Sequence, residues 1–162
     1  MCGIAGIVNL SERPVTMDDI SGMLKTIKHR GPDDEGTYFK DNIGIGQVRL
    51  SIIDLSSAGH QPMFSNENRY SIVFNGEIYN YLELKEVLKD KYSFKTKSDT
   101  EVILAAYSVW GEDCLSKFNG DFSFVIYDVQ EKVFFGARDR FGVKPFYYHQ
   151  NQTGFYFASE IK

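Results

Sequence analysis

The chain contains few of the residues that hold small secreted domains together. Its 162 residues include only two cysteines, Cys2 and Cys114. Two cysteines make a poor disulfide framework, and this favours a reducing cytosol as the compartment. The first residues also lack the basic region and apolar stretch of a secretory signal peptide. We therefore expect a cytoplasmic protein that folds without disulfides.

Long apolar runs and clusters of positive charge are absent as well. No apolar stretch approaches the roughly 18 residues of a membrane span. Lys and Arg number 18 against 22 Asp and Glu, which gives a net charge of −4, and they form no basic block. Neither nucleic acid nor a membrane is therefore expected as a partner. No Cys and His residues have metal-ligand spacing, so we expect no metal site. No Gly-rich phosphate loop occurs either.

Apolar residues, in contrast, are plentiful. Hydrophobic residues make up 43% of the chain and aromatic residues 15%. A chain of this length fits one domain and can bury roughly 70% of the surface that its unfolded form exposes. Phe and Tyr are crowded between Phe118 and Phe157. This crowding predicts several buried strands in that segment.

Strands are predicted at both ends of the chain. Residues 3–9 form a short apolar run, and residues 70–74 form another that ends at Asn75-Gly76. Further strands are predicted where residues alternate or run apolar between turn residues, at 36–39, 43–48, 121–128, 132–137, 145–149 and 154–158.

Helices are predicted between these strands. Apolar residues with helical spacing cover residues 17–28, and Thr16 is the expected N-cap. Asn80 begins a second helix. A third begins at Ser98-Asp99-Thr100-Glu101, which resembles a capping sequence. Strands first and last, with helices between them, indicate an α+β layered fold.

Cys2 is the most informative single position. If Met1 is removed, Cys2 carries a thiol and a free α-amino group on the same residue. Their reference pKa values are about 8.5 and about 7.7–8.0, so the amine can act as a base near neutral pH. One residue would then supply both nucleophile and base. The alternative, a small hydrophobic residue at the start of a strand, stays open because many proteins begin with Met-Cys.

Asn75-Gly76 also permits two interpretations. Asn-Gly is a common turn dipeptide, so a tight turn is the simpler one. The other is an oxyanion hole, in which the Asn75 side-chain amide and the Gly76 N–H point at a developing negative charge.

Arg49 and Asp99 could bind the two charged ends of an amino acid. Arg49 heads an otherwise apolar run and needs a carboxylate partner, either in the protein or in a ligand. Asp99 opens a helix, where capping alone would explain it, although it could also hold a ligand ammonium group. Each residue alone has a structural explanation, but the chain offers one partner for each charge.

These residues lie within an ordered series of motifs. The series is Met1-Cys2-Gly3-Ile4, His29-Arg30-Gly31-Pro32-Asp33, Arg49-Leu50-Ser51-Ile52-Ile53-Asp54, Phe74-Asn75-Gly76-Glu77-Ile78-Tyr79-Asn80 and Ser98-Asp99-Thr100-Glu101. It resembles the motifs of the class II glutamine amidotransferases. Two later runs, residues 120–128 and 137–145, resemble asparagine synthetases in particular. The likeness covers essentially the whole chain.

The resemblance implies a role for each site residue. Cys2 would be the nucleophile, and Asn75 with Gly76 the oxyanion hole. The substrate L-glutamine would be held at its α-carboxylate by Arg49 and at its α-ammonium by Asp99 and Glu77. Backbone groups of Leu50, Ser51, Ile52 and Ile53 would line the pocket.

The resemblance also implies a fold and partners. The family fold is a four-layer αββα sandwich of two antiparallel sheets between helices, of the N-terminal-nucleophile hydrolase type. Residues 1–162 would be one glutaminase domain at the N-terminal part of a longer chain. No cofactor is expected here, because ATP and Mg²⁺ would bind only in a C-terminal synthetase domain, whose pyrophosphate-binding signature is absent. Exposed apolar residues are expected near Lys162.

Several alternatives remain open at this stage. The ammonia could go to a sugar or polysaccharide precursor rather than to aspartate, or the domain could be an interaction module that has lost glutaminase activity. A homodimer is also open. Arg30, His60 and Cys114 are expected to be structural, with Arg30 shaping the loop that borders Cys2.

Overall fold

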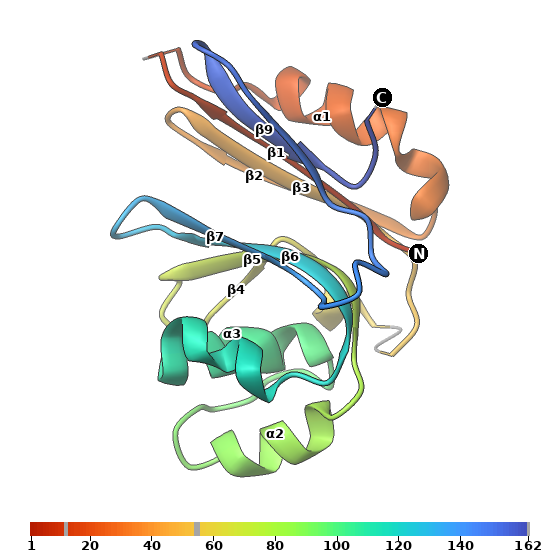
Figure 1. Ribbon diagram of the computed structural model, residues 1–162, viewed down its shortest axis with the longest axis vertical. Helices are drawn as coiled ribbons and strands as arrows, with labels where there is room; N and C mark the ends of the chain where they lie inside the picture. The colour runs from red at the N-terminus through yellow and green to blue at the C-terminus, as the bar shows by residue number, and fades with distance from the viewer. Residues whose placement is uncertain (12, 54–55, 162) are drawn as a thin grey trace.

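Two antiparallel sheets are stacked between layers of helix (Figure 1). The computed structural model describes residues 1–11, 13–53 and 56–161. One sheet has the order β2-β3-β1-β9-β8 and the other β4-β5-β6-β7. Helix α1 packs on the first sheet, and α3 packs on the second with α2 packed against α3 (Figure 1). The expected four-layer αββα sandwich is therefore confirmed.

The elements have the following bounds. The strands are β1 (Gly3–Asn9), β2 (Asp34–Lys40), β3 (Ile43–Arg49), β4 (Met63–Phe64), β5 (Tyr70–Ile78), β6 (Gly120–Asp128), β7 (Val133–Arg138), β8 (Tyr147–Gln150) and β9 (Gly154–Ala158). The α-helices are α1 (Met17–Thr26), α2 (Tyr81–Leu88) and α3 (Asp99–Trp110), and the 3₁₀ helices are η1 (Lys28–Arg30), η2 (Ser57–Gly59) and η3 (Gly111–Lys117).

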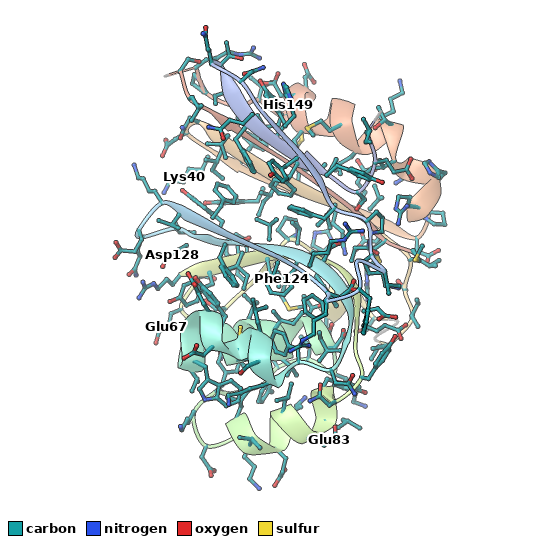
Figure 2. All side chains as sticks on the ribbon, in the orientation of Figure 1. Lys40, Glu67, Glu83, Phe124, Asp128 and His149 are labelled. Carbon is teal, nitrogen blue, oxygen red and sulfur yellow. The ribbon has the colours of Figure 1, made fainter. Side chains whose placement is uncertain are left out.

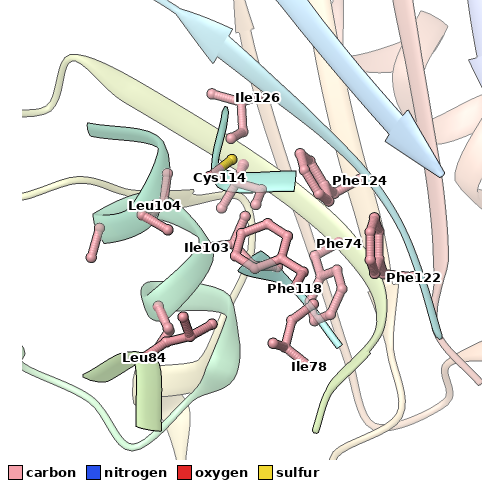
Figure 3. Close-up of a cluster of buried hydrophobic side chains, with 14 of the residues drawn as sticks. Phe74, Ile78, Leu84, Ile103, Leu104, Cys114, Phe118, Phe122, Phe124 and Ile126 are labelled. Atoms are coloured by element: carbon pink, nitrogen blue, oxygen red, sulfur yellow. The ribbon is translucent and has the colours of Figure 1, made fainter. Parts of the chain in front are cut away.

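Each pair of adjacent layers encloses its own buried cluster. Ile20 and Leu24 of α1 pack on the first sheet, and Ile4, Ile45 and Val73 lie between the two sheets. The largest cluster joins the second sheet to α2, α3 and η3, and its side chains are drawn in Figure 3. Charged side chains such as Lys40, Glu67 and Glu83 are exposed outside, whereas Phe124 is fully buried (Figure 2).

Strand β5 does not end where the sequence predicts. It continues through Asn75 and Gly76 to Ile78, because β6 pairs with it along its whole length. Gly76 permits this pairing: its φ is +156°, and a Cβ there would lie 2.2 Å from the Asp121 carbonyl oxygen. The tight turn at Asn75-Gly76 is therefore wrong.

The other predicted elements are close to those observed. Strands β1 and β9 have the predicted bounds, and Thr16 caps α1 through a capping box with Asp19. Helix α1 ends at Thr26 and continues as η1, so its predicted end at residue 28 is wrong. The short strand β4 was not predicted.

Burial of the aromatic segment is only partly as expected. β6 is mostly buried, but all four residues of β8 are exposed, because β8 is the edge strand of its sheet. Ile161, near the end of the chain, is 80% exposed, as expected there. Among the described residues no helix is both long and apolar enough to cross a membrane.

Candidate active site

Strand alternation directs three candidate residues into the space between the sheets. Side chains two or four residues apart on a strand share a face. Ile4 and Val73 belong to the cluster between the two sheets. Cys2 lies two residues before Ile4, and Asn75 lies two residues after Val73. Arg49 lies four residues after Ile45 of the same cluster. The three candidates therefore face one another across the end of the sandwich.

These residues line a single pocket together with the start of α3. Its lining residues are Met1, Cys2, Arg49, Leu50, Ile52, Ile53, Gly59, Gln61, Phe74, Asn75, Gly76, Glu77, Ser98, Asp99, Thr100 and Lys144. Every candidate from the sequence is among them except Ser51, whose N–H instead donates to Asp33 Oδ2 at 2.9 Å. Asp54, which ends the same motif, lies outside the described residues.

The Cys2 thiol is half-buried against the backbone of Leu50. Leu50 N–H donates to Cys2 Sγ at 3.4 Å, and the thiol donates to Leu50 O at 3.5 Å. Burial raises the pKa of the Cys2 thiol, and the Leu50 hydrogen bond offsets this only in part. The thiol is therefore protonated near neutral pH and needs a base to become a nucleophile.

Arg30 fixes the backbone beside this thiol. Its Nε donates to the Cys2 carbonyl oxygen at 3.0 Å, and its Nη1 donates to Glu160 Oε1 at 3.1 Å. This agrees with the structural role expected for Arg30. Cys114 is fully buried, and burial raises the pKa of its thiol to about 12.

Asn75 presents an unpaired donor. Its side chain is 1% exposed, and within the described part of the chain its Nδ2 has no hydrogen-bond partner. Buried polar atoms nearly always have a partner, so one left open beside a pocket indicates a place for a ligand acceptor.

The Gly76 N–H faces the same region. Residues of β5 with odd numbers bond to β6, as the flanking Val129 N–H to Arg69 O (2.8 Å) and Tyr79 N–H to Asn119 O (2.7 Å) bonds show. Residues with even numbers therefore direct their N–H groups to the opposite edge.

Protein acceptors occupy the two neighbouring positions on that edge. Phe74 N–H donates to Gln61 Oε1 at 2.7 Å, and Ile78 N–H donates to Asp99 Oδ2 at 3.0 Å. The Gly76 N–H lies between them and lines the pocket. With Asn75 Nδ2 it forms a pair of donors able to stabilise a negatively charged oxygen.

Asp99 and Arg49 place opposite charges at the pocket. Asp99 is 4% exposed, and desolvation raises the pKa of its carboxyl to about 6, with the charge of nearby Glu77 adding to the effect. Arg49 is 8% exposed, and its Nη1 donates to Ser56 O at 3.1 Å. A buried anion and a buried cation can bind the ammonium and carboxylate of one amino acid.

Sequence reasoning missed several lining residues, including Gly59, Gln61, Thr100 and Lys144. They come from loops and element ends, where no periodic pattern marks a contact. The α3 cap was predicted only in part. Ser98 does accept from Thr100 N, but Glu101 caps the N–H groups of Lys95 and Thr96 instead of that of Ser98.

No metal cluster accompanies this pocket. Within residues 1–11, 13–53 and 56–161 no group of three or more His, Cys, Asp or Glu side chains is placed to hold a metal ion. The expectation of a domain without cofactor stays a prediction.

Comparison with known proteins gives consistent matches. The model of the glutamine amidotransferase domain family matches residues 1–162. The chain is 48% identical to a putative glutamine-hydrolysing asparagine synthetase of Methanocaldococcus jannaschii and 46% identical to asparagine synthetase 1 of Bacillus subtilis. All of this chain is covered in both, but it spans only 34% and 26% of the lengths of these relatives.

A solved structure shares the fold. It is the glutamine phosphoribosylpyrophosphate amidotransferase of B. subtilis in complex with ADP and GMP. It matches with a TM-score of 0.80 at 24% identity, over 98% of this chain and 42% of that one. Since the family model matches from the first residue to the last and the relatives are similar over the same span, the protein belongs to the family of glutamine amidotransferase domains.

Proposed function

We propose that the chain hydrolyses the side-chain amide of L-glutamine to glutamate and ammonia. The observation that carries this proposal is the unpaired Asn75 Nδ2 beside the Gly76 N–H, in one pocket with the Cys2 thiol. An amide carbonyl oxygen that becomes negatively charged on attack would accept hydrogen bonds from these two donors.

The reaction proceeds through a thioester. A base removes the Cys2 thiol proton, and the thiolate attacks the side-chain amide carbon of glutamine. The C–N bond breaks as the leaving nitrogen takes up a proton, which releases ammonia and leaves a γ-glutamyl thioester on Cys2. Water then attacks the thioester, and glutamate leaves as the thiolate is restored.

The base is the α-amino group of Cys2 itself. It becomes available only after Met1 is removed, since a peptide nitrogen cannot accept the thiol proton. The raised pKa of the Cys2 thiol supports the need for such a base.

The charged ends of glutamine are bound by opposite walls of the pocket. Arg49 holds the α-carboxylate, and Asp99 with Glu77 holds the α-ammonium. Backbone groups of residues 50–53 border the substrate. The burial of Arg49 and Asp99 in the wall of one pocket supports these roles, because charged groups held away from water bind an oppositely charged ligand group strongly.

The ammonia serves asparagine synthesis in this proposal. The relatives are named as glutamine-hydrolysing asparagine synthetases and are about three to four times longer than this chain. A C-terminal domain that uses ATP and Mg²⁺ to activate aspartate would receive the ammonia. Exposed apolar side chains at Tyr148 and Ile161 support a contact with such a domain at this end of the molecule.

Glutamate release and intact mass test the proposal together. Active protein should lack Met1 in its mass spectrum, and Cys2→Ala should abolish glutaminase turnover without unfolding the chain. Cys114→Ala is the matched control and should keep its activity, because that thiol is buried away from the pocket. Robust turnover by protein that fully retains Met1 would contradict the mechanism.

A further inference from the structure

The edge of β5 that carries the Gly76 N–H has only a short strand beside it. β4 pairs with β5 at Ser71 and Ile72 and goes no further. Beyond Ile72, the even-numbered residues of β5 direct backbone groups to an edge that β4 does not reach. An unpaired strand edge has no ladder to fix its position, yet this one leads directly into Asn75 and Gly76.

Two buried glutamine side chains make the hydrogen bonds to the Phe74 backbone that a neighbouring strand would otherwise make. Gln61 Oε1 accepts from Phe74 N–H at 2.7 Å, and Gln47 Nε2 donates to the Phe74 carbonyl oxygen at 2.6 Å. Gln61 is 5% exposed and Gln47 is 1% exposed. Both backbone groups of Phe74 are thus held, one by a loop and the other by β3 of the opposite sheet.

These contacts reach the rest of the site. The Phe74 carbonyl belongs to the same rigid peptide group as the Asn75 nitrogen, so holding one orients the other. Gln61 Nε2 also donates to Thr100 Oγ1 at 3.1 Å, in the first turn of α3 next to Asp99. The Gln61 side-chain amide therefore links β5, which carries Asn75 and Gly76, to α3, which carries the buried Asp99 carboxylate.

We propose that Gln47 and Gln61 are positioning residues that hold Asn75 and Gly76 in the geometry of the oxyanion hole. This inference rests on the proposed glutaminase function. Neither side chain needs to contact the reacting amide. Each acts through the Phe74 backbone, with Gln47 as a donor and Gln61 as an acceptor.

Replacement by methionine, which keeps the length of the side chain but cannot make these bonds, tests the roles. Gln47→Met and Gln61→Met should each lower kcat for glutamine by about 10- to 100-fold, the effect of a small misplacement of catalytic groups. KM should change by less than about threefold, since the donors act mainly in the transition state. If a Met variant does not fold, the Asn variant, which shortens the amide by one methylene, takes its place.

Gln61→Glu supplies the conservative variant. In its protonated form, which burial beside Asp99 favours, its carboxyl can still accept from Phe74 N–H and donate to Thr100 Oγ1, so it should recover most of the kcat that Gln61→Met loses. The matched control is Asn42→Leu, which removes the Asn42 Nδ2 to Asn9 O bond (2.7 Å) at the end of β1 opposite to Cys2. That variant should keep its kcat.

A double-mutant cycle separates positioning from a general effect on the fold. In the Asn75→Ala background, Gln61→Met should lower kcat by a smaller factor than it does in the wild type, because only the Gly76 N–H is left to be misplaced. Full additivity of the two losses, or wild-type kcat in both Met variants, would overturn the proposal.

An NMR readout is independent of glutaminase activity. The Gly76 amide and the Asn75 side-chain NH₂ resonances should shift or broaden in Gln47→Met and Gln61→Met but not in Asn42→Leu. A wild type that shows no turnover would refute the proposed function. Unchanged Asn75 and Gly76 resonances would refute the positioning role.

Discussion

Asp99 is a carboxylate held almost out of contact with water. Burial raises the pKa of its carboxyl from 3.8 to about 6, even though Ile78 and Thr100 N–H groups favour the charged form. A buried carboxylate without a cation is costly, and a bound ammonium would offset that cost. The residue is therefore suited to bind a cation near neutral pH and to lose that ability in mild acid.

This leads to a prediction about pH. Protonation of the Cys2 α-amine, whose reference pKa is about 7.7–8.0, should already lower kcat/KM for glutamine below about pH 8. kcat/KM should then fall more steeply as the pH drops below about 6, because protonated Asp99 has no charge to pair with the α-ammonium. The folded-state pKa is raised, so this group stabilises the fold most below pH 3.8, and that contribution is lost as the pH rises through about 6. Loss of activity between pH 6 and 4 therefore cannot come from unfolding caused by Asp99.

The pH profile and thermal unfolding should be measured on the same preparations. Asp99→Asn should bind glutamine weakly and should lack the limb near pH 6. A limb near pH 6 that persists in Asp99→Asn would assign the titration to another group.

Some of these residues could be recognised from the sequence and others could not. Arg49, Asn75 and Asp99 stand in ordered motifs, which made them candidates before any geometry was known. Gln61 bonds to Phe74 and Thr100, 13 and 39 positions away, and no local pattern predicts such partners. Gln47 did leave a signal, a lone amide within the apolar run of β3.

At the level of elements, Gly59 of η2 lies directly against the Arg49 guanidinium. A Cβ added at Gly59 would lie 2.0 Å from Arg49 Nη2. Because that atom is the far end of a long side chain, the backbone can stay in place while the guanidinium moves. Gly59 thus sets the position of the group that we assign to the α-carboxylate.

Gly59→Ala should therefore impair binding of glutamine more than folding. KM should rise by roughly 10- to 100-fold, the range for a lost hydrogen bond to a charged group, with little change in kcat. Steady-state kinetics and thermal unfolding check this. Gly22→Ala is the matched control. A Cβ at Gly22 would have no atom within 4 Å, and Gly22 lies on the exposed face of α1, so the change should add about 0.5–1 kcal/mol of stability without changing KM. An unchanged KM in Gly59→Ala would argue against the role of Arg49.

Element boundaries were predictable where one pattern acted alone. β1 and β9 are continuous apolar runs, and their bounds agree with the structure. The sequence predicts that β5 ends at residue 74, because Asn75-Gly76 is a common turn dipeptide. In the structure, pairing with β6 along the whole strand outweighs that local preference. β4 has only two residues and leaves no periodic signal.

For the whole molecule, the layered arrangement explains where the chemistry lies. The proposed nucleophile directly precedes β1 of one sheet and the proposed oxyanion donors belong to β5 of the other, so the pocket exists only when both sheets are stacked. The order of strands and helices predicts an α+β layered fold, and the resemblance carried by the motifs implies its four layers. The exposure of β8 could not be predicted, since an edge strand and a buried strand can have equally aromatic sequences.

The chain by itself should hydrolyse glutamine but make no asparagine. Its pocket contains a thiol, the two proposed oxyanion donors and the two charged groups that we assign to an amino acid, whereas its sequence contains no Gly-rich loop for the phosphates of ATP. Ammonia formed in the pocket would then escape to solvent. An assay with glutamine, aspartate, ATP and Mg²⁺ that follows glutamate and asparagine together should detect glutamate alone, at a rate that ATP does not change. Adding free ammonia in place of glutamine should also yield no asparagine, because we assign activation of the aspartate carboxylate to the C-terminal domain. Asparagine formed under either condition would require an ATP site within these 162 residues. It would contradict the proposal that this chain hydrolyses glutamine and a separate C-terminal domain forms asparagine.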